Sequence, residues 1–472
     1  MSFLTTPLLS RRFQLVRASF LQRDGLPFAD VLSEERIEHV LDAEGAQFAE
    51  ADEDVYTPSV TLWAFLSQML FKSEQRSCAA AVARVVSLIV GEGRPSPCDN
   101  TGDYCRARGK LPEKAVSRLT IETAARLEKA VPVSWLWRGR HVKLVDGTTV
   151  TAADTIANQA VWPQSTSQTP GLGFPILRMV VLLSLATGML CGMAEGPYAG
   201  KETGETALFR ELLDQLARDD IVLADRYYCS YFMIALLLER GVDVVTPLHQ
   251  LRDADFRQGK SLGHRDHLVT WIRPPRPEWK SEETYSRMPK TLTLRKLEVE
   301  VCEPGFRPEN FVVVTSLKNA RCYTRSDITG LYRRRWLAEL DLRAIKDNVG
   351  LDFLRCKSPE MVRKELWTGL LAYNLLRQLI AQSGAQQGVG PRRVSFTAAM
   401  QKVAAGWCLL PLSDAALAWR IATAHLQQLA GQEVGHRPNR VEPRAIKRRP
   451  KPHDLLTKPR REAQAELLAA HG

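Results

Sequence analysis

Residues 331–346, LYRRRWLAELDLRAIK, set the expectations for the rest of the chain. The stretch contains no glycine or proline and many strong helix formers, which predicts a helix. At about 100° per residue, four side chains fall within an arc of about 60° on one face: Tyr332, Arg335, Glu339 and Lys346. This face carries a carboxylate between two cations. In an adjacent sector, Leu337, Leu340 and Ala344 are expected to anchor the helix to a core.

Two interpretations of this charged face are open. At roughly 1.5 Å per residue the row is about 21 Å long, which is enough to follow several phosphates of a nucleic acid. The alternative is a solvated basic face supported by pairs four residues apart, of which Arg335 and Glu339 would be one.

Composition narrows the class of protein. With 45% apolar and 25% charged residues, the 472-residue chain is typical of a globular protein and long enough for about two to four domains. Its 64 Lys and Arg against 53 Asp and Glu leave a charge of +11, which favours a polyanionic partner. Nine cysteines without a CxxC pair favour reduced thiols in a cytosol. The longest apolar run, 179–194, is too short and too interrupted to span a bilayer, so we expect no membrane segment and no signal peptide.

Two aspartates follow short apolar runs. In HVKLVDG the run ends at Asp146, and Gly147 after it suits a sharp turn; in IVLAD, Asp225 ends a buried strand. Because α/β folds place chemistry at strand ends, the two aspartates are candidates for one site. Taken singly, each is equally suited to a turn or a helix cap. Arg226 comes next, as a candidate phosphate contact or as a partner in a structural ion pair.

Asp146, Asp225 and Glu339 together suit phosphodiester hydrolysis. That reaction needs an activated water and stabilisation of charge on the phosphate, and two divalent cations about 3.5 to 4 Å apart supply both. Such cations require hard oxygen ligands, which three carboxylates provide once folding brings them together. We expect Mg²⁺, with Mn²⁺ as a substitute, because no Cys/His set suits zinc.

The pattern of the chain changes along its length. We expect a helical DNA-binding module or a plain helical bundle at 1–130, with a polar, basic loop at 91–111. The first part of an α/β core follows at 138–246, then an all-β insertion at 247–327 and a core helix with Glu339 at 328–358. The chain ends with a helical region at 359–430, suited to dimerisation or to packing on the first module, and a basic tail at 431–472. Residues 437–461 hold ten Lys or Arg against Glu442 and Asp454, which indicates a basic arm on nucleic acid or a solvated disordered tail.

The spacing of Tyr332, Arg335, Glu339 and Lys346 resembles the Y-(2)-R-(3)-E-(6)-K signature of a branch of bacterial insertion-sequence DDE transposases, the family four type. DGT at 146–148 and DRYY at 225–228 extend the resemblance, as does the order of elements. It implies an α/β, RNase H-like core and a Mg²⁺-dependent enzyme that nicks double-stranded DNA at its element's terminal inverted repeats. The freed 3′-hydroxyl is the next nucleophile, and the element is inserted into target DNA. A homodimer in the DNA complex and a cytoplasmic, nucleoid-associated location are also implied.

Carried over by position, the resemblance assigns DNA contacts to several side chains. Tyr332, Arg335 and Lys346 would hold phosphates next to the cut. Trp336 would stack near a hairpin or a flipped base, although a core tryptophan fits the sequence equally well. An aromatic residue of the insertion, Trp271 or Trp279, would hold the flipped base.

Two other functions are alternatives to this one. The first is a non-catalytic relative that occupies transposon ends as a regulator or inhibitor. The three intact carboxylates argue against it, because a protein that only binds DNA has no need of them. The second is a different RNase H-like nuclease, which would lack the charged row of residues 332–346.

Overall fold

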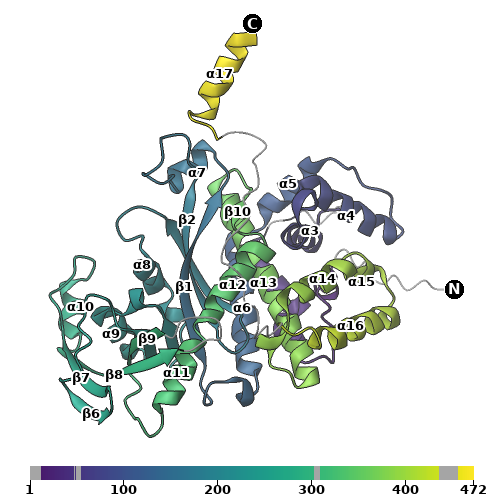
Figure 1. Cartoon of the computed structure of the whole chain (residues 1–472). Helices are drawn as coiled ribbons and strands as arrows, with labels where there is room; N and C mark the ends of the chain where they lie inside the picture. The colour runs from purple at the N-terminus through teal and green to yellow at the C-terminus, as the bar shows by residue number, and fades with distance from the viewer. Residues whose placement is uncertain (1–11, 47, 49–54, 302–308, 435–454, 472) are drawn as a thin grey trace.

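The structure is a computed structural model that describes residues 12–46, 48, 55–301, 309–434 and 455–471. A long twisted sheet lies beside a body of helices drawn from both ends of the sequence (Figure 1). In the part of the chain that is described, no helix is long and apolar enough to cross a membrane.

Ten strands within the described residues form one mixed sheet in the order β3-β2-β1-β4-β5-β9-β8-β7-β6, and the short β10 pairs with β1. The strands are β1 (Val142–Ala152), β2 (Ile176–Ser184), β3 (Leu190–Pro197), β4 (Ile221–Ala224), β5 (Asp243–Pro247), β6 (Lys260–Gly263), β7 (Asp266–Ile272), β8 (Thr291–Val301), β9 (Glu309–Thr315) and β10 (Phe353–Leu354). β1, β2 and β3 are antiparallel neighbours, whereas β1, β4 and β5 run parallel.

The register of β1 corrects one prediction. Its parallel pairing with β4 ends at Val145 opposite Ala224, so Asp146 and Asp225 are the next residue on each strand. β1 itself does not end there, and Gly147 does not turn the chain. The strand continues to Ala152 because its antiparallel pairing with β2 supplies hydrogen bonds beyond that point. The prediction that the first strand ends at Asp146 was therefore wrong.

Alternate residues of β1 face two separate hydrophobic clusters, as expected for a strand buried on both sides. Leu144 belongs to a cluster shared with the helical body, while Val145 belongs to one shared with helices α8 (Glu205–Glu211) and α9 (Tyr231–Glu239). By this alternation Asp146 directs its side chain to the same face as Leu144, and Gly147 lies on the same face as Val145. Side chains from helices on either face of the sheet can therefore reach the place where the pairing of β1 with β4 ends.

The helical body joins the N-terminal and C-terminal regions. It contains α1 (Gln14–Ser19), α2 (Glu34–Ala43), α3 (Pro58–Leu70), α4 (Cys78–Gly91), α5 (Thr101–Lys110), α6 (Glu113–Ala130), α13 (Pro359–Gln387), α14 (Phe396–Gly406), α15 (Leu409–Leu412) and α16 (Ala415–Ala430). α13 is buried along most of its length and packs on α3, α6 and α16. Trp63 and Trp407 stack with ring centroids 5.3 Å apart. Residues 359–430, for which dimerisation or packing on the N-terminal helices was expected, therefore pack on the N-terminal helices in the structure.

The predicted polar loop at 91–111 is wrong in its second half, where α5 forms. The side chain of Asn100 caps this helix by accepting a hydrogen bond from the amide of Gly102 at 2.8 Å. Tyr104 is fully buried, and the guanidinium of Arg108 lies 4.9 Å from the ring centroid of Phe65. Arg108 therefore contributes to packing, which its position among polar residues did not indicate.

Strands β6 to β9 make up most of the predicted insertion, which also contains the short helix α10 (Glu282–Arg287). The description of an all-β insertion was therefore too narrow, because Ser281 caps a helical turn there. Pairing of β9 with β5 continues the central sheet into the insertion. Two further helices are α7 (Ile156–Val161) and α17 (Arg460–His471). Residues 435–454, with most of the predicted basic arm, lie outside the described residues.

Candidate active site

The stretch 331–346 folds as two helices and a wide turn, so the prediction of one continuous helix was wrong. α11 (Arg325–Arg333) and α12 (Trp336–Arg343) are followed by a π-helical turn, η7 (Ala344–Asn348). Around residues 334–338, backbone amides bond to carbonyls three residues back, which is tighter than an α-helix. In η7 the amide of Val349 bonds to the carbonyl of Ala344, five residues back. One distortion therefore lies on each side of Glu339.

A buried carboxylate anchors α12 together with the buried apolar side chains of Ala338 and Leu342. Asp341 is fully buried and accepts hydrogen bonds from Arg377 of α13 and from Arg392, the latter at 2.7 Å to both carboxylate oxygens. Of the expected anchors, Ala344 is buried and Leu337 is half-buried against the core, whereas Leu340 is half-buried and lies outside the core cluster. Arg392 also donates to backbone carbonyls at the end of β2. This ion pair therefore ties the helix that carries Glu339 to both α13 and the sheet.

The three predicted carboxylates come from three different elements. Asp146 lies within β1 and accepts a hydrogen bond from the amide of Gly147 at 2.9 Å. Asp225 directly follows β4, where its carboxylate accepts the amide of Arg226 at 2.5 Å. Glu339 lies on α12, and its Oε1 accepts a hydrogen bond from Arg335 Nη2 at 3.0 Å. The last contact is the i,i+4 ion pair that the sequence offered as an alternative.

The guanidinium of Arg335 interacts electrostatically with all three carboxylates. Burial alone would lower the pKa of Arg335, but Tyr332 and the charges of Asp225, Asp146 and Glu339 raise it above its usual value. Asp146 shows the opposite balance. Burial, together with the charges of Glu205 and Glu339, raises the pKa of Asp146 to about 6, although the Gly147 amide and Arg335 act to lower it. Residues far apart in the sequence thus act on one another at a single place.

Lys346 and Tyr332 lie close to this place. Lys346 Nζ donates to Thr148 Oγ1 at 3.3 Å, two residues beyond Asp146 on β1. Tyr332 is 7% exposed and packs on Phe311, with ring centroids 5.5 Å apart. The phenol is also hydrogen-bonded to Arg335, and burial raises its pKa. The predicted row is therefore assembled, with Tyr332 mostly covered.

The structure does not support a core position for Trp336 or a structural ion pair for Arg226. Trp336 is 50% exposed, so it is not a core tryptophan. No carboxylate among the described residues forms an ion pair with Arg226, which is half-buried beside Tyr332. Both side chains are therefore accessible to a ligand.

In the described part of the chain, no three His, Cys, Asp or Glu side chains are arranged as ligands of one metal ion. Without a cation between them the carboxylates repel one another, and Glu339 pairs with Arg335 instead. The residues nevertheless fit a hard divalent cation, because the donors are carboxylate oxygens and Asp146 lacks full compensation for its burial.

One acidic residue of this site was missed. Glu205, the first residue of α8, accepts a hydrogen bond from the hydroxyl of Tyr228 at 3.3 Å, and its charge raises the pKa of Asp146. Sequence offered no specific signal for it, because an acidic residue in the first turn of a helix is common for purely local reasons.

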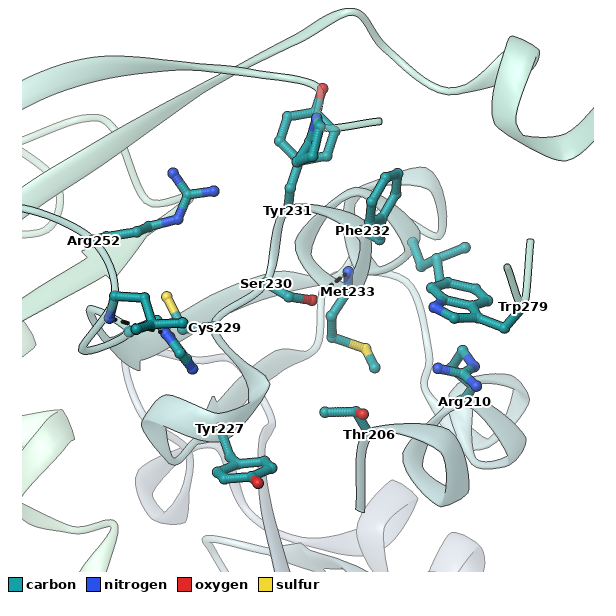
Figure 2. Close-up of a pocket in the computed structure, with 14 residues that line it drawn as sticks. Thr206, Arg210, Tyr227, Cys229, Ser230, Tyr231, Phe232, Met233, Arg252 and Trp279 are labelled. Carbon is teal, nitrogen blue, oxygen red and sulfur yellow. Dashed lines mark hydrogen bonds between the residues drawn. The ribbon is translucent and has the colours of Figure 1, made fainter. Parts of the chain in front are cut away.

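A pocket of about 630 Å³ lies next to α8, between the core and the insertion. Figure 2 shows Tyr227, Tyr231, Phe232 and Trp279 around it, with Arg210 beside Trp279. The Arg210 guanidinium carbon lies 4.0 Å from the indole centroid. By contrast, Trp271 is 8% exposed and is covered by Arg252 at 3.7 Å.

Comparisons with known proteins identify the family of the chain. The family model described as "Transposase DDE domain" matches residues 137–375, about half of the chain, and the match includes all three carboxylates. The chain is 28% identical over 299 residues to transposase InsG for insertion sequence element IS4 of Escherichia coli (strain K12). This match covers 62% of the present chain and 64% of that relative, so the chain spans less than two thirds of its length.

A solved structure is also similar. It is the cryo-EM structure of a piggyBac transposase synaptic complex with hairpin DNA, at 9% identity and a TM-score of 0.41, covering 89% of this chain and 87% of that one. The family assignment depends instead on the domain match, which confirms the resemblance predicted from residues 331–346, DGT and DRYY. The chain belongs to the DDE transposase family.

Proposed function

We propose that the chain is a DNA transposase that cuts double-stranded DNA at the ends of its own element and transfers the freed strand to target DNA. One observation supports this most strongly. The Arg335 guanidinium pairs with Glu339 at 3.0 Å, and the charges of Asp225 and Asp146, which lie far from it in the sequence, also raise its pKa. In this proposal the three carboxylates meet where the pairing of β1 with β4 ends, a location typical of active sites in α/β folds.

The strand arrangement supports an RNase H-like core. β3, β2 and β1 form an antiparallel meander, and β4 and β5 extend it in parallel with β1. α12 then returns to pack on β1, and we propose that Glu339 on this helix joins the two aspartates. In the DNA complex we expect a homodimer, as the family resemblance implies.

The carboxylates are proposed to hold Mg²⁺. When bound, divalent ions supply an activated oxygen nucleophile and stabilise charge on the reacting phosphate. Asp146, Asp225 and Glu339 would be the ligands. For Glu339 to serve, its ion pair with Arg335 must open, and the released guanidinium is then available to a DNA phosphate.

The test of this function is DNA cutting by the purified full-length protein. DNA carrying the inverted repeats that flank the gene should be nicked at the repeat ends with Mg²⁺ or Mn²⁺ and remain intact with EDTA. A shuffled repeat is the matched control. Binding to the repeats without any cutting in either metal would contradict the proposal and favour a non-catalytic relative.

Arg335 and Lys346 are proposed to grip phosphates beside the cut. Both lie at the carboxylate site, and phosphate contacts by cations make affinity depend on salt. Arg335→Ala and Lys346→Ala should each weaken DNA binding and flatten the slope of log affinity against log salt by about one. Arg343→Ala, an exposed cation on the same helix, is the control. An unchanged slope with a large fall in melting temperature would instead indicate a structural ion pair.

Trp279 is the better of the two candidates for a flipped base. It is half-buried and lines the pocket in Figure 2 together with aromatic residues, whereas Trp271 is buried at 8% exposure. Base stacking on an aromatic residue is worth about 1–3 kcal/mol. Fluorescence of 2-aminopurine placed next to the cleavage site should change on binding the wild type and stay as in free DNA with Trp279→Ala. If Trp271→Ala has that effect and Trp279→Ala does not, the assignment is wrong.

A further inference from the structure

Glu205 approaches the site from the face of the sheet opposite to α12. α8 packs on β2 and β3, and its apolar residues belong to the cluster that includes Val145. α12 belongs to the other cluster, with Leu144. The two carboxylates that act on Asp146 therefore reach it from different sides, where the pairing of β1 with β4 has ended.

Gly147 provides the space for the Glu205 carboxyl group. A Cβ atom built at this glycine would lie 2.3 Å from Glu205 Cδ and 2.6 Å from Oε1, closer than real atoms approach. The backbone of Gly147 is ordinary β-strand, so the absent side chain matters here for space and not for backbone freedom. Any larger residue would displace the carboxylate from beside Asp146.

Glu205 is half-buried, and no Lys, Arg or His of the described residues forms an ion pair with it. Its carboxylate accepts a hydrogen bond from the hydroxyl of Tyr228. Burial raises the pKa of this tyrosine, and the charges of Glu205, Asp146 and Asp225 raise it as well. Placing carboxylates together in this way is unfavourable unless a cation joins them.

From this arrangement we infer that Glu205 is a fourth carboxylate of the metal site and supplies a ligand to a divalent cation held by Asp146. The inference rests on the proposed function, because it adds a ligand to the same site. Gly147 is then a positioning residue, whose role is to leave room for that ligand. Octahedral Mg²⁺ requires several oxygen ligands, and a further carboxylate from α8 contributes one.

Mn²⁺ binding by the full-length protein tests the inference without relying on activity. Free Mn²⁺ is measured by electron paramagnetic resonance during titration of the wild type, Glu205→Gln and Glu211→Gln. Glu211 is the matched control, since it is an exposed glutamate at the other end of α8. Glu205→Gln should weaken Mn²⁺ binding by about tenfold or more, the size seen even for outer-shell changes, and Glu211→Gln should leave it unchanged.

Two further variants separate a ligand from a structural residue. Gly147→Ala keeps every carboxylate but displaces that of Glu205, so it should weaken Mn²⁺ binding as Glu205→Gln does. Tyr228→Phe removes only the hydrogen bond to Glu205 and should leave Mn²⁺ binding as in the wild type. Equal losses in Tyr228→Phe and Glu205→Gln would assign the effect to that hydrogen bond and overturn the inference.

Asp225→Asn distinguishes failure of the inference from failure of the proposed function. Weaker Mn²⁺ binding in both Asp225→Asn and Glu205→Gln supports four carboxylates. A loss in Asp225→Asn with wild-type binding in Glu205→Gln leaves the proposed site standing and overturns the role of Glu205. Wild-type binding in both overturns the metal site itself, and the fourth ligand with it.

Discussion

Asp225→Asn is expected to abolish Mg²⁺-dependent nicking while leaving DNA binding and folding intact. The substitution preserves the size of the side chain and an oxygen that can accept the amide of Arg226, so the turn after β4 should persist. It removes the negative charge that a divalent cation requires. We expect nicking to fall by about a hundredfold or more, as when one electrostatic group of an active site is removed.

The measurement compares nicking rates and DNA affinity for the wild type, Asp225→Asn, Asp146→Asn and Glu339→Gln. Asp214→Asn is the control, because Asp214 is an aspartate whose side chain is 86% exposed and pairs with Arg240 at the surface. All three site variants should lose cutting and keep binding. Cutting at the wild-type rate by any of them would remove that residue from the proposed site.

Asp341→Ala is expected to cause the largest loss of stability of the substitutions considered. It would leave Arg377 buried and Arg392 half-buried without their carboxylate, and removing one partner of a buried pair costs about 3–5 kcal/mol. Glu339→Gln, two residues away, breaks a partly exposed pair and should cost about 0–1 kcal/mol. Urea denaturation followed by circular dichroism gives both free energies of unfolding.

These neighbouring carboxylates therefore test a division of roles on α12. Asp341 holds the helix in place, and Glu339 is free to serve the site. The outcome that contradicts this division is a stable Asp341→Ala protein together with an unfolded Glu339→Gln protein.

Much of the candidate site was predictable because its signals are local. Despite the distortions around α12, Arg335 pairs with Glu339, and Lys346 donates to Thr148 two residues beyond Asp146. Asp225 was placed correctly, because four apolar residues before it make a short buried strand. The packing of α13 was left open, since its apolar surface alone does not specify a partner.

The errors arose where hydrogen bonds or tertiary contacts override a local pattern. Helix propensity does not encode the tight turns near residue 335 or the π-turn after Arg343, so one continuous helix was expected. The extension of β1 past Asp146 depends on β2, a partner about 30 residues away along the chain. The role of Glu205 depends on its meeting Gly147, and neither residue carries that information alone.

The most direct test of the central claim is anomalous diffraction from crystals of the full-length protein grown with its terminal repeat DNA and Mn²⁺. The account predicts manganese peaks within about 2.0 to 2.2 Å of carboxylate oxygens of Asp146, Asp225 and Glu339, with the Arg335 guanidinium turned from Glu339 toward a phosphate. Manganese bound elsewhere, with the Arg335 to Glu339 pair intact and DNA in place, would contradict it.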